Sequence, residues 1–79
     1  MTRSIYTERY QVFTECLIDA RKKSGLTQQQ VADQLDRPQS FVAKYERGER
    51  RLDVVEFLEV ADILKVNPVS LIKEVRAAS

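Results

Sequence analysis

Hydrophobic residues recur at helical spacing in five segments of the chain and never alternate with period two for more than a few residues. In the first segment the intervals alternate between four and three, which places the side chains on one face of a helix. These side chains belong to Tyr6, Tyr10, Phe13, Leu17 and Ala20. The first helix is expected to run from about Ser4 or Thr7 to Lys23, and Gly25 supplies the left-handed residue that ends it.

The second segment begins with a helix-start signal. Thr27 is a good N-cap, and Gln30 completes a capping box three residues later. An apolar face at helical spacing follows at Val31, Ala32 and Leu35. The sequence therefore predicts a short helix that begins at residue 28.

A break at residues 36–38 separates this helix from the next, because the proline ring biases the residue before it away from helical geometry. The next helix is expected to bury Val42 and Tyr45 and to end at Gly48. It exposes Gln, Ser and Lys side chains and is braced by the helix before it. This is how a helix-turn-helix presents a helix to the DNA major groove, so residues 28–47 are predicted to form that motif.

Two further helices are predicted in the last third of the chain. Asp53 and Glu56 form a second capping box. The inner face of the helix that follows consists of Phe57, Val60, Ala61 and Leu64. Asn67 before Pro68 starts a last helix over residues 68–77. The predicted fold class is all-α, with five helices in one domain over residues 1–79.

The composition excludes several classes of protein. No apolar run is long enough for a membrane span, and no signal-peptide pattern is present. One cysteine and no histidine exclude an internal disulfide, a familiar zinc site and His-dependent nucleophilic catalysis. We therefore expect no enzyme activity, no metal and no cofactor. Cys16 is interpreted as a small buried hydrophobe in a reducing cytoplasm, with a redox sensor as the alternative.

Charge is distributed unevenly, although the net charge is only +1. Residues 1–51 hold ten of the thirteen basic side chains and seven acidic ones, whereas residues 52–79 hold three basic and five acidic ones. A basic front and an acidic back favour a module that docks on phosphate with one side.

Two short runs carry a family resemblance. Gly-Leu-Thr-Gln at residues 25–28 and Glu-Arg-Gly at residues 46–48, with the apolar positions around them, resemble the Cro/repressor-type (Xre-like) helix-turn-helix family over about residues 13–72. The resemblance implies a compact, lambda-repressor-like DNA-binding domain. Asp36 stands where the family has glycine, and Arg37 where it has a small aliphatic residue. The charged Arg37 either opens the turn or points outward towards phosphate.

The resemblance places Gln39 and Ser40 at base edges, and Lys44 lies one turn later on the same face. Gln can pair with adenine, Ser with several groups, and Lys with guanine or phosphate. The alternative is that all three are ordinary solvated side chains. Phe41 either packs on the core side of the helix or contacts a thymine methyl group.

Phosphate contacts are expected on both sides of this helix. Gln28 opens the preceding helix, where backbone N–H groups and the helix dipole favour phosphate, and the resemblance assigns it the same contact. The basic candidates are Arg37, Arg47, Arg50 and Arg51. A contribution to solubility is the alternative for the arginines after Gly48. By the resemblance, Arg21 and Glu46 form an ion pair that ties the first helix to the third.

The last helix supplies candidate dimer contacts, namely Val69, Leu71, Ile72 and Val75. Some of them must cover the core, and the surplus suits a two-fold homodimer. The expected function is a cytoplasmic, bacterial or phage-derived transcriptional regulator, a dimeric repressor or autoregulator that binds a pseudo-palindromic double-stranded DNA operator. The alternative is an antitoxin-like or other protein-interaction module with an unidentified protein partner.

Overall fold

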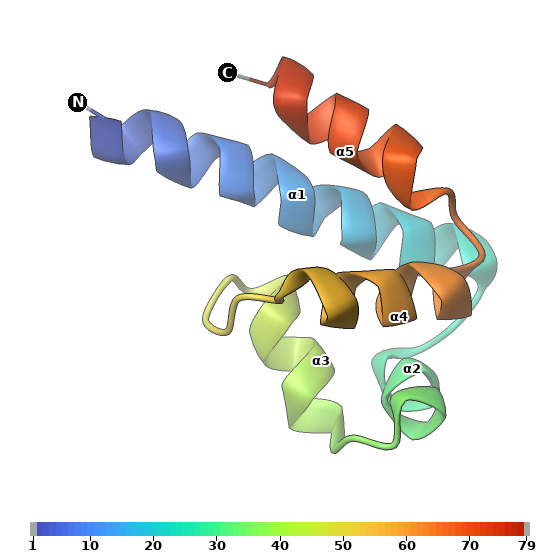
Figure 1. Cartoon of the computed structure of the whole chain (residues 1–79). Coiled ribbons are helices and arrows are strands. Elements are labelled where there is room, and N and C mark those ends of the chain that lie inside the picture. The colour runs from blue at the N-terminus through green and yellow to red at the C-terminus, as the bar shows by residue number, and fades with distance from the viewer. Residues whose placement is uncertain (1, 79) are drawn as a thin grey trace.

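The structure, a computed structural model, describes the backbone of residues 2–78 and the side chains of residues 8–78. It has five helices and, within these residues, no strand (Figure 1). The helices are α1 (Thr2–Ser24), α2 (Gln28–Leu35), α3 (Gln39–Glu46), α4 (Val54–Leu64) and α5 (Pro68–Ala77). The predicted all-α, five-helix fold is confirmed. Helix α1 begins a few residues earlier than expected, and the side chain of Tyr6 lies outside the described residues.

The helices form two groups joined by α4. Helices α1 and α5 lie side by side, while α2 and α3 pack against each other at the opposite end of the molecule (Figure 1). Helix α4 crosses between the two groups and contacts α1, α2 and α5. This arrangement leaves one side of α3 facing away from the rest of the protein.

Both predicted capping boxes are present. The backbone N–H of Gln30 donates to Thr27 Oγ1 at 3.1 Å, and the backbone N–H of Thr27 donates to Gln30 Oε1 at 2.9 Å. At the start of α4, the N–H of Glu56 donates to Asp53 Oδ1 at 2.7 Å, and the N–H of Asp53 donates to Glu56 Oε1 at 3.0 Å. These reciprocal bonds satisfy N–H groups that a helix start leaves without a partner.

The turn between α2 and α3 is closed. Asp36 adopts the left-handed conformation with φ 58° and ψ 44°, which its short polar side chain tolerates. Its N–H donates to the carbonyl groups of Ala32 and Asp33, and the N–H of Arg37 donates to Ala32 O at 3.0 Å. The alternative in which Arg37 opens the turn is wrong, because the N–H groups of Asp36 and Arg37 both bond back to the end of α2.

The core consists of the inner faces of all five helices. Its most deeply buried large side chains are Leu17, Val31, Val42, Tyr45 and Val60. Leu71 also belongs to it, with 7% of its surface exposed. The expectation that Leu71 contributes to a dimer contact is therefore corrected, because its side chain is buried in the core cluster. No helix among the described residues is long and apolar enough to cross a membrane.

Candidate nucleic-acid interface

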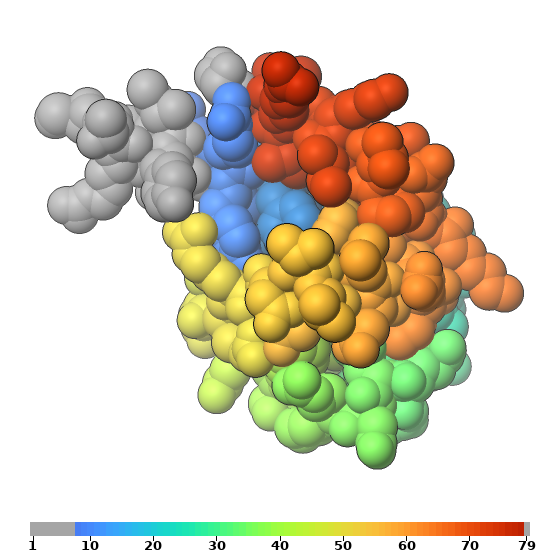
Figure 2. Space-filling view, in the orientation of Figure 1, coloured from blue at the N-terminus to red at the C-terminus, as the bar shows by residue number. Residues whose placement is uncertain are grey.

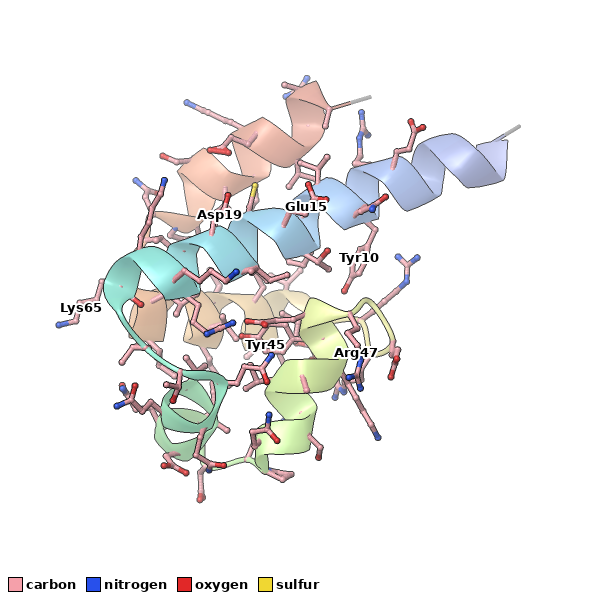
Figure 3. The ribbon with its side chains drawn as sticks, turned by 180° about the vertical axis from the view of Figure 1, so that it is seen from behind. Tyr10, Glu15, Asp19, Tyr45, Arg47 and Lys65 are labelled. Atoms are coloured by element: carbon pink, nitrogen blue, oxygen red, sulfur yellow. The ribbon has the colours of Figure 1, made fainter. Side chains whose placement is uncertain are left out.

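Helix α3 divides into a buried and an exposed face. Val42 and Tyr45 point into the core, whereas Gln39, Ser40 and Lys44 are exposed. The three exposed residues were the predicted base-reading side chains, and helical spacing brings them to one surface. In the labelled view, Tyr45 lies on the inner side of α3 towards α1 (Figure 3). The helix thus presents three polar side chains from a rigid, anchored element.

A chain of hydrogen bonds links this surface to the interior. Arg21 Nε donates to Glu46 Oε2 at 2.7 Å, and Arg21 Nη2 donates to Glu46 Oε1 at 3.2 Å. Gln28 Nε2 donates to the same Glu46 Oε1 at 2.8 Å. Gln28 Oε1 in turn accepts from Gln39 Nε2 at 2.7 Å. We call the side chains of Arg21, Glu46, Gln28 and Gln39 the anchor chain.

The anchor chain begins with a shielded ion pair. The Arg21 and Glu46 side chains are only 14% and 5% exposed, and Arg21 also donates to Leu26 O at 3.1 Å. The two-pronged geometry is the strong form of an arginine–carboxylate contact. It ties the end of α1 to the end of α3, the contact that the resemblance implied.

Gln39 lies at the outer end of the anchor chain. Its Nε2 bonds to Gln28, and among the described residues its Oε1 and its second Nε2–H have no further partner. In the major groove such an N–H can donate to adenine N7 while the amide oxygen accepts from adenine N6. Gln28, predicted to bind phosphate, is therefore partly committed within the protein, and its contact with Gln39 was not predicted.

The arginines after α3 differ in their surroundings. Arg47 pairs with Glu49 at 3.1 Å, but both side chains are more than half exposed. Such a pair contributes little and is easily exchanged for another anion. The guanidinium of Arg51 lies 4.3 Å from the ring centroid of Tyr10, a cation–π contact. Figure 3 shows Tyr10 directed from α1 towards this loop and Arg47 beside it.

Arg50 is more tightly engaged. Its Nη1 and Nη2 donate to Glu56 at 2.7 and 2.9 Å, and Nη1 also donates to Arg51 O at 2.6 Å. Arg37 Nη2 reaches the same carboxylate at 3.4 Å. The hydrogen bond from Arg50 is the largest cause that lowers the pKa of Glu56, followed by the backbone hydrogen bond from Asp53. The charged Glu56 carboxylate thus binds two arginines of this surface at once.

From the sequence, Glu56 was expected only to cap the start of a helix. The signal that could have revealed more is the grouping of arginines just before a carboxylate that is fixed at a helix start.

Phe41, for which the sequence left two alternatives, is buried, and its ring contacts Tyr45 edge-on at 5.6 Å between centroids. The core-packing alternative for Phe41 is confirmed.

Cys16 does not belong to this surface, since it lies on α1 and contacts α5. Its Sγ donates to Glu74 Oε2 at 3.5 Å. Burial, followed by the hydrogen bond to the Glu74 carboxylate, raises the pKa of the Cys16 thiol to about 11. A high pKa disfavours the thiolate, which is the reactive form of cysteine.

Cys16 is therefore expected to react slowly with iodoacetamide at pH 8. A pKa raised from 9.0 to about 11 lowers the thiolate fraction by about two orders of magnitude. Alkylation followed by mass spectrometry should be about 100-fold slower in the folded protein than in urea. Equal rates would contradict the assigned environment, and faster alkylation of the folded protein would favour a reactive, redox-active thiol.

The comparisons with known proteins agree with this geometry. A model of the helix-turn-helix family matches residues 17–71. A solved structure described as an XRE-family like protein from Pseudomonas syringae pv. tomato str. DC3000 is 42% identical, with a TM-score of 0.90. The match covers 96% of this chain and 93% of that chain. None of the curated proteins compared with the chain matches it.

The fold and the family match define a helix-turn-helix DNA-binding domain. The chain belongs to the XRE family of helix-turn-helix proteins. Members of this family are DNA-binding regulators and not enzymes.

Proposed function

We propose that this chain is a sequence-specific transcriptional regulator that acts in the cytoplasm and reads the major groove with α3. The observation that carries the proposal is the anchor chain, which fixes Gln39 from the protein interior while its Oε1 and an N–H remain available. Ser40 and Lys44 share its exposed face. A reading side chain held by other hydrogen bonds loses little freedom when it meets a base.

Phosphate contacts are assigned to the arginines that flank α3. Arg47 is the most readily available, since its pair with Glu49 is exposed. Arg37 precedes α3 in the sequence and Arg51 follows it, and both are exposed, although Arg37 also contacts Glu56 and Arg51 the Tyr10 ring. Gln28 and Arg50 are engaged within the protein, so they contribute through their remaining N–H groups. These contacts supply affinity and register, while α3 supplies sequence preference.

The decisive experiment selects bound duplexes from a random-sequence pool and measures binding of the selected duplex at several salt concentrations. A DNA reader enriches one sequence, and its affinity falls with salt, with a slope of about 0.9 for each phosphate contacted. No enrichment and no salt-dependent shift would contradict the proposal. That result would favour the protein-interaction alternative.

A homodimer is the second part of the proposal. Val69 and Ile72 on α5 are more than half exposed, as are Val54 and Val55 on α4. Figure 2 shows α4 and α5 next to each other on one face of the molecule. One recognition helix reads only a few base pairs, which is too little discrimination in a genome. Two copies joined through this face would read half-sites about one helical turn, roughly 34 Å, apart, as expected of a dimeric repressor or autoregulator.

Ile72→Asp is expected to convert the dimer into a monomer at micromolar concentration. The aspartate places a charge in the middle of an apolar contact, which is costly to desolvate. Sedimentation equilibrium measures the change, with circular dichroism to confirm folding. Ser70→Asp is the matched control, because it adds the same charge to an exposed position of the same helix. A wild-type protein that is already monomeric on a single half-site would contradict the dimer.

A further inference from the structure

Four side chains from four consecutive segments meet around the Phe41 ring, in the first turn of α3. Arg37 comes from the turn before this helix, Phe41 from its first turn, Arg50 from the loop after it, and Glu56 from the first turn of α4. The guanidinium carbons of Arg37 and Arg50 lie 4.5 and 4.9 Å from the Phe41 ring centroid. Both guanidinium groups also bond to Glu56. We call these four residues the arginine bracket.

The arginine bracket is more than a pair of surface charges. The Glu56 side chain is only 12% exposed, and its carboxylate accepts from Arg50, from Arg37 and from the backbone of Asp53. Exposed ion pairs contribute little because long side chains must be ordered to form them. Here the capping box already fixes the carboxylate, and the Phe41 ring supports both guanidinium planes. The cost of ordering the two arginines is thereby reduced.

The two arginines use their donors differently. Arg50 donates from both terminal nitrogens, to the Glu56 carboxylate and to the Arg51 carbonyl. Arg37, whose side chain is 42% exposed, gives one nitrogen to Glu56 through a long contact of 3.4 Å. A guanidinium carries five N–H groups. Within the described part of the chain, Arg37 therefore keeps most of its donors for a ligand, and it lies two residues before Gln39.

The geometry points to Glu56 as a positioning residue for DNA recognition. By holding Arg37 and Arg50 against Phe41, Glu56 directs the remaining N–H groups of Arg37 to a DNA phosphate beside the bases that Gln39 and Ser40 read. Phosphate contacts fix the register of a reading helix on the duplex, so Glu56 acts on sequence preference without touching DNA. This inference rests on the proposed function of α3.

The test compares wild-type protein with Glu56→Gln. The probes are a labelled duplex that wild-type protein selects from a random pool and a scrambled duplex of the same composition. Glutamine keeps the acceptor oxygen that the capping box requires, so α4 still begins at the same place. Both arginines lose their ionic partner. Glu15→Gln on α1 (Figure 3) is the control for the same change in net charge at an exposed position.

In Glu56→Gln, affinity for the scrambled duplex should rise, and its salt slope should steepen by about 0.9, since a released arginine can neutralise one more phosphate. The preference for the selected duplex should fall by about tenfold, within the range of coupling between contacting side chains. Glu15→Gln should keep the wild-type preference. In an Arg37→Ala background, Glu56→Gln should cause no further loss of preference.

Three results would overturn the inference. If the variant lost affinity for both duplexes in proportion to its unfolded fraction, Glu56 would serve only to cap the start of α4. An equal gain on both duplexes would mean that only its negative charge matters. If Glu56→Gln still lowered the preference by about tenfold in the Arg37→Ala background, Glu56 would not act through Arg37. If wild-type protein bound no duplex with salt dependence, the proposed function itself would fail instead.

Discussion

Glu46→Ala is expected to lower the free energy of unfolding by about 3–5 kcal/mol, the usual cost of removing one partner of a shielded ion pair. The change leaves Arg21 without its carboxylate in a site where the arginine is only 14% exposed. It also removes the acceptor of Gln28. For a domain of this size, the melting temperature should fall by about 12 °C or more. Thermal unfolding followed by circular dichroism measures the effect.

Glu49→Ala is the matched control, because Glu49 also pairs with an arginine. That pair is exposed on both sides, so its loss should cost less than about 1 kcal/mol. Both variants remove one carboxylate from an arginine, so the difference between their free energies of unfolding reports the burial of the Arg21–Glu46 pair. An unchanged melting temperature for Glu46→Ala would mean that Arg21 and Glu46 do not meet in solution.

Gln39→Ala is expected to weaken binding to the selected duplex by about 1–3 kcal/mol and to relax the preference at one position of each half-site. The variant removes an amide donor and acceptor but no charge. Its salt slope should therefore equal that of the wild type. Titration of the selected duplex and of its single-position variants measures both quantities.

Arg47→Ala gives the opposite pattern and serves as the comparison for Gln39→Ala. A lost phosphate contact weakens every sequence alike and reduces the salt slope by about 0.9. If Gln39→Ala weakened selected and scrambled duplexes equally, α3 would not be the reading helix. The roles assigned to Ser40 and Lys44 would then have to be withdrawn with it.

The helix starts were predictable because their chemistry is local. The pairs Thr27 with Gln30 and Asp53 with Glu56 act over three residues, so their spacing in the sequence determines their geometry. Pro68 marks the start of α5 for a similar reason, since its fixed φ suits the first helical position. Such signals located the starts of α2, α4 and α5, whereas the start of α3 was inferred from the break at residues 36–38.

The candidate site was less predictable, since its contacts join segments that only the fold brings together. Gln28 and Gln39 are eleven residues apart, and Arg37 and Glu56 are nineteen apart. The spacing of hydrophobic residues does not indicate which arginine contacts the protein and which one stays exposed. Leu71 could not be separated from its exposed neighbours on α5 for the same reason. The face that a helix buries depends on the helices packed against it.

The anchor chain also constrains how this protein could acquire a new target sequence. If α3 reads bases as proposed, a different side chain at position 39 changes the base that is read. It also leaves Gln28 Oε1 without its present donor. Gln28 in turn shares Glu46 with the ion pair that joins α1 and α3. A change of operator therefore favours paired substitutions at positions 28 and 39. Divergence of specificity among relatives should leave a trace of covariation between these two positions.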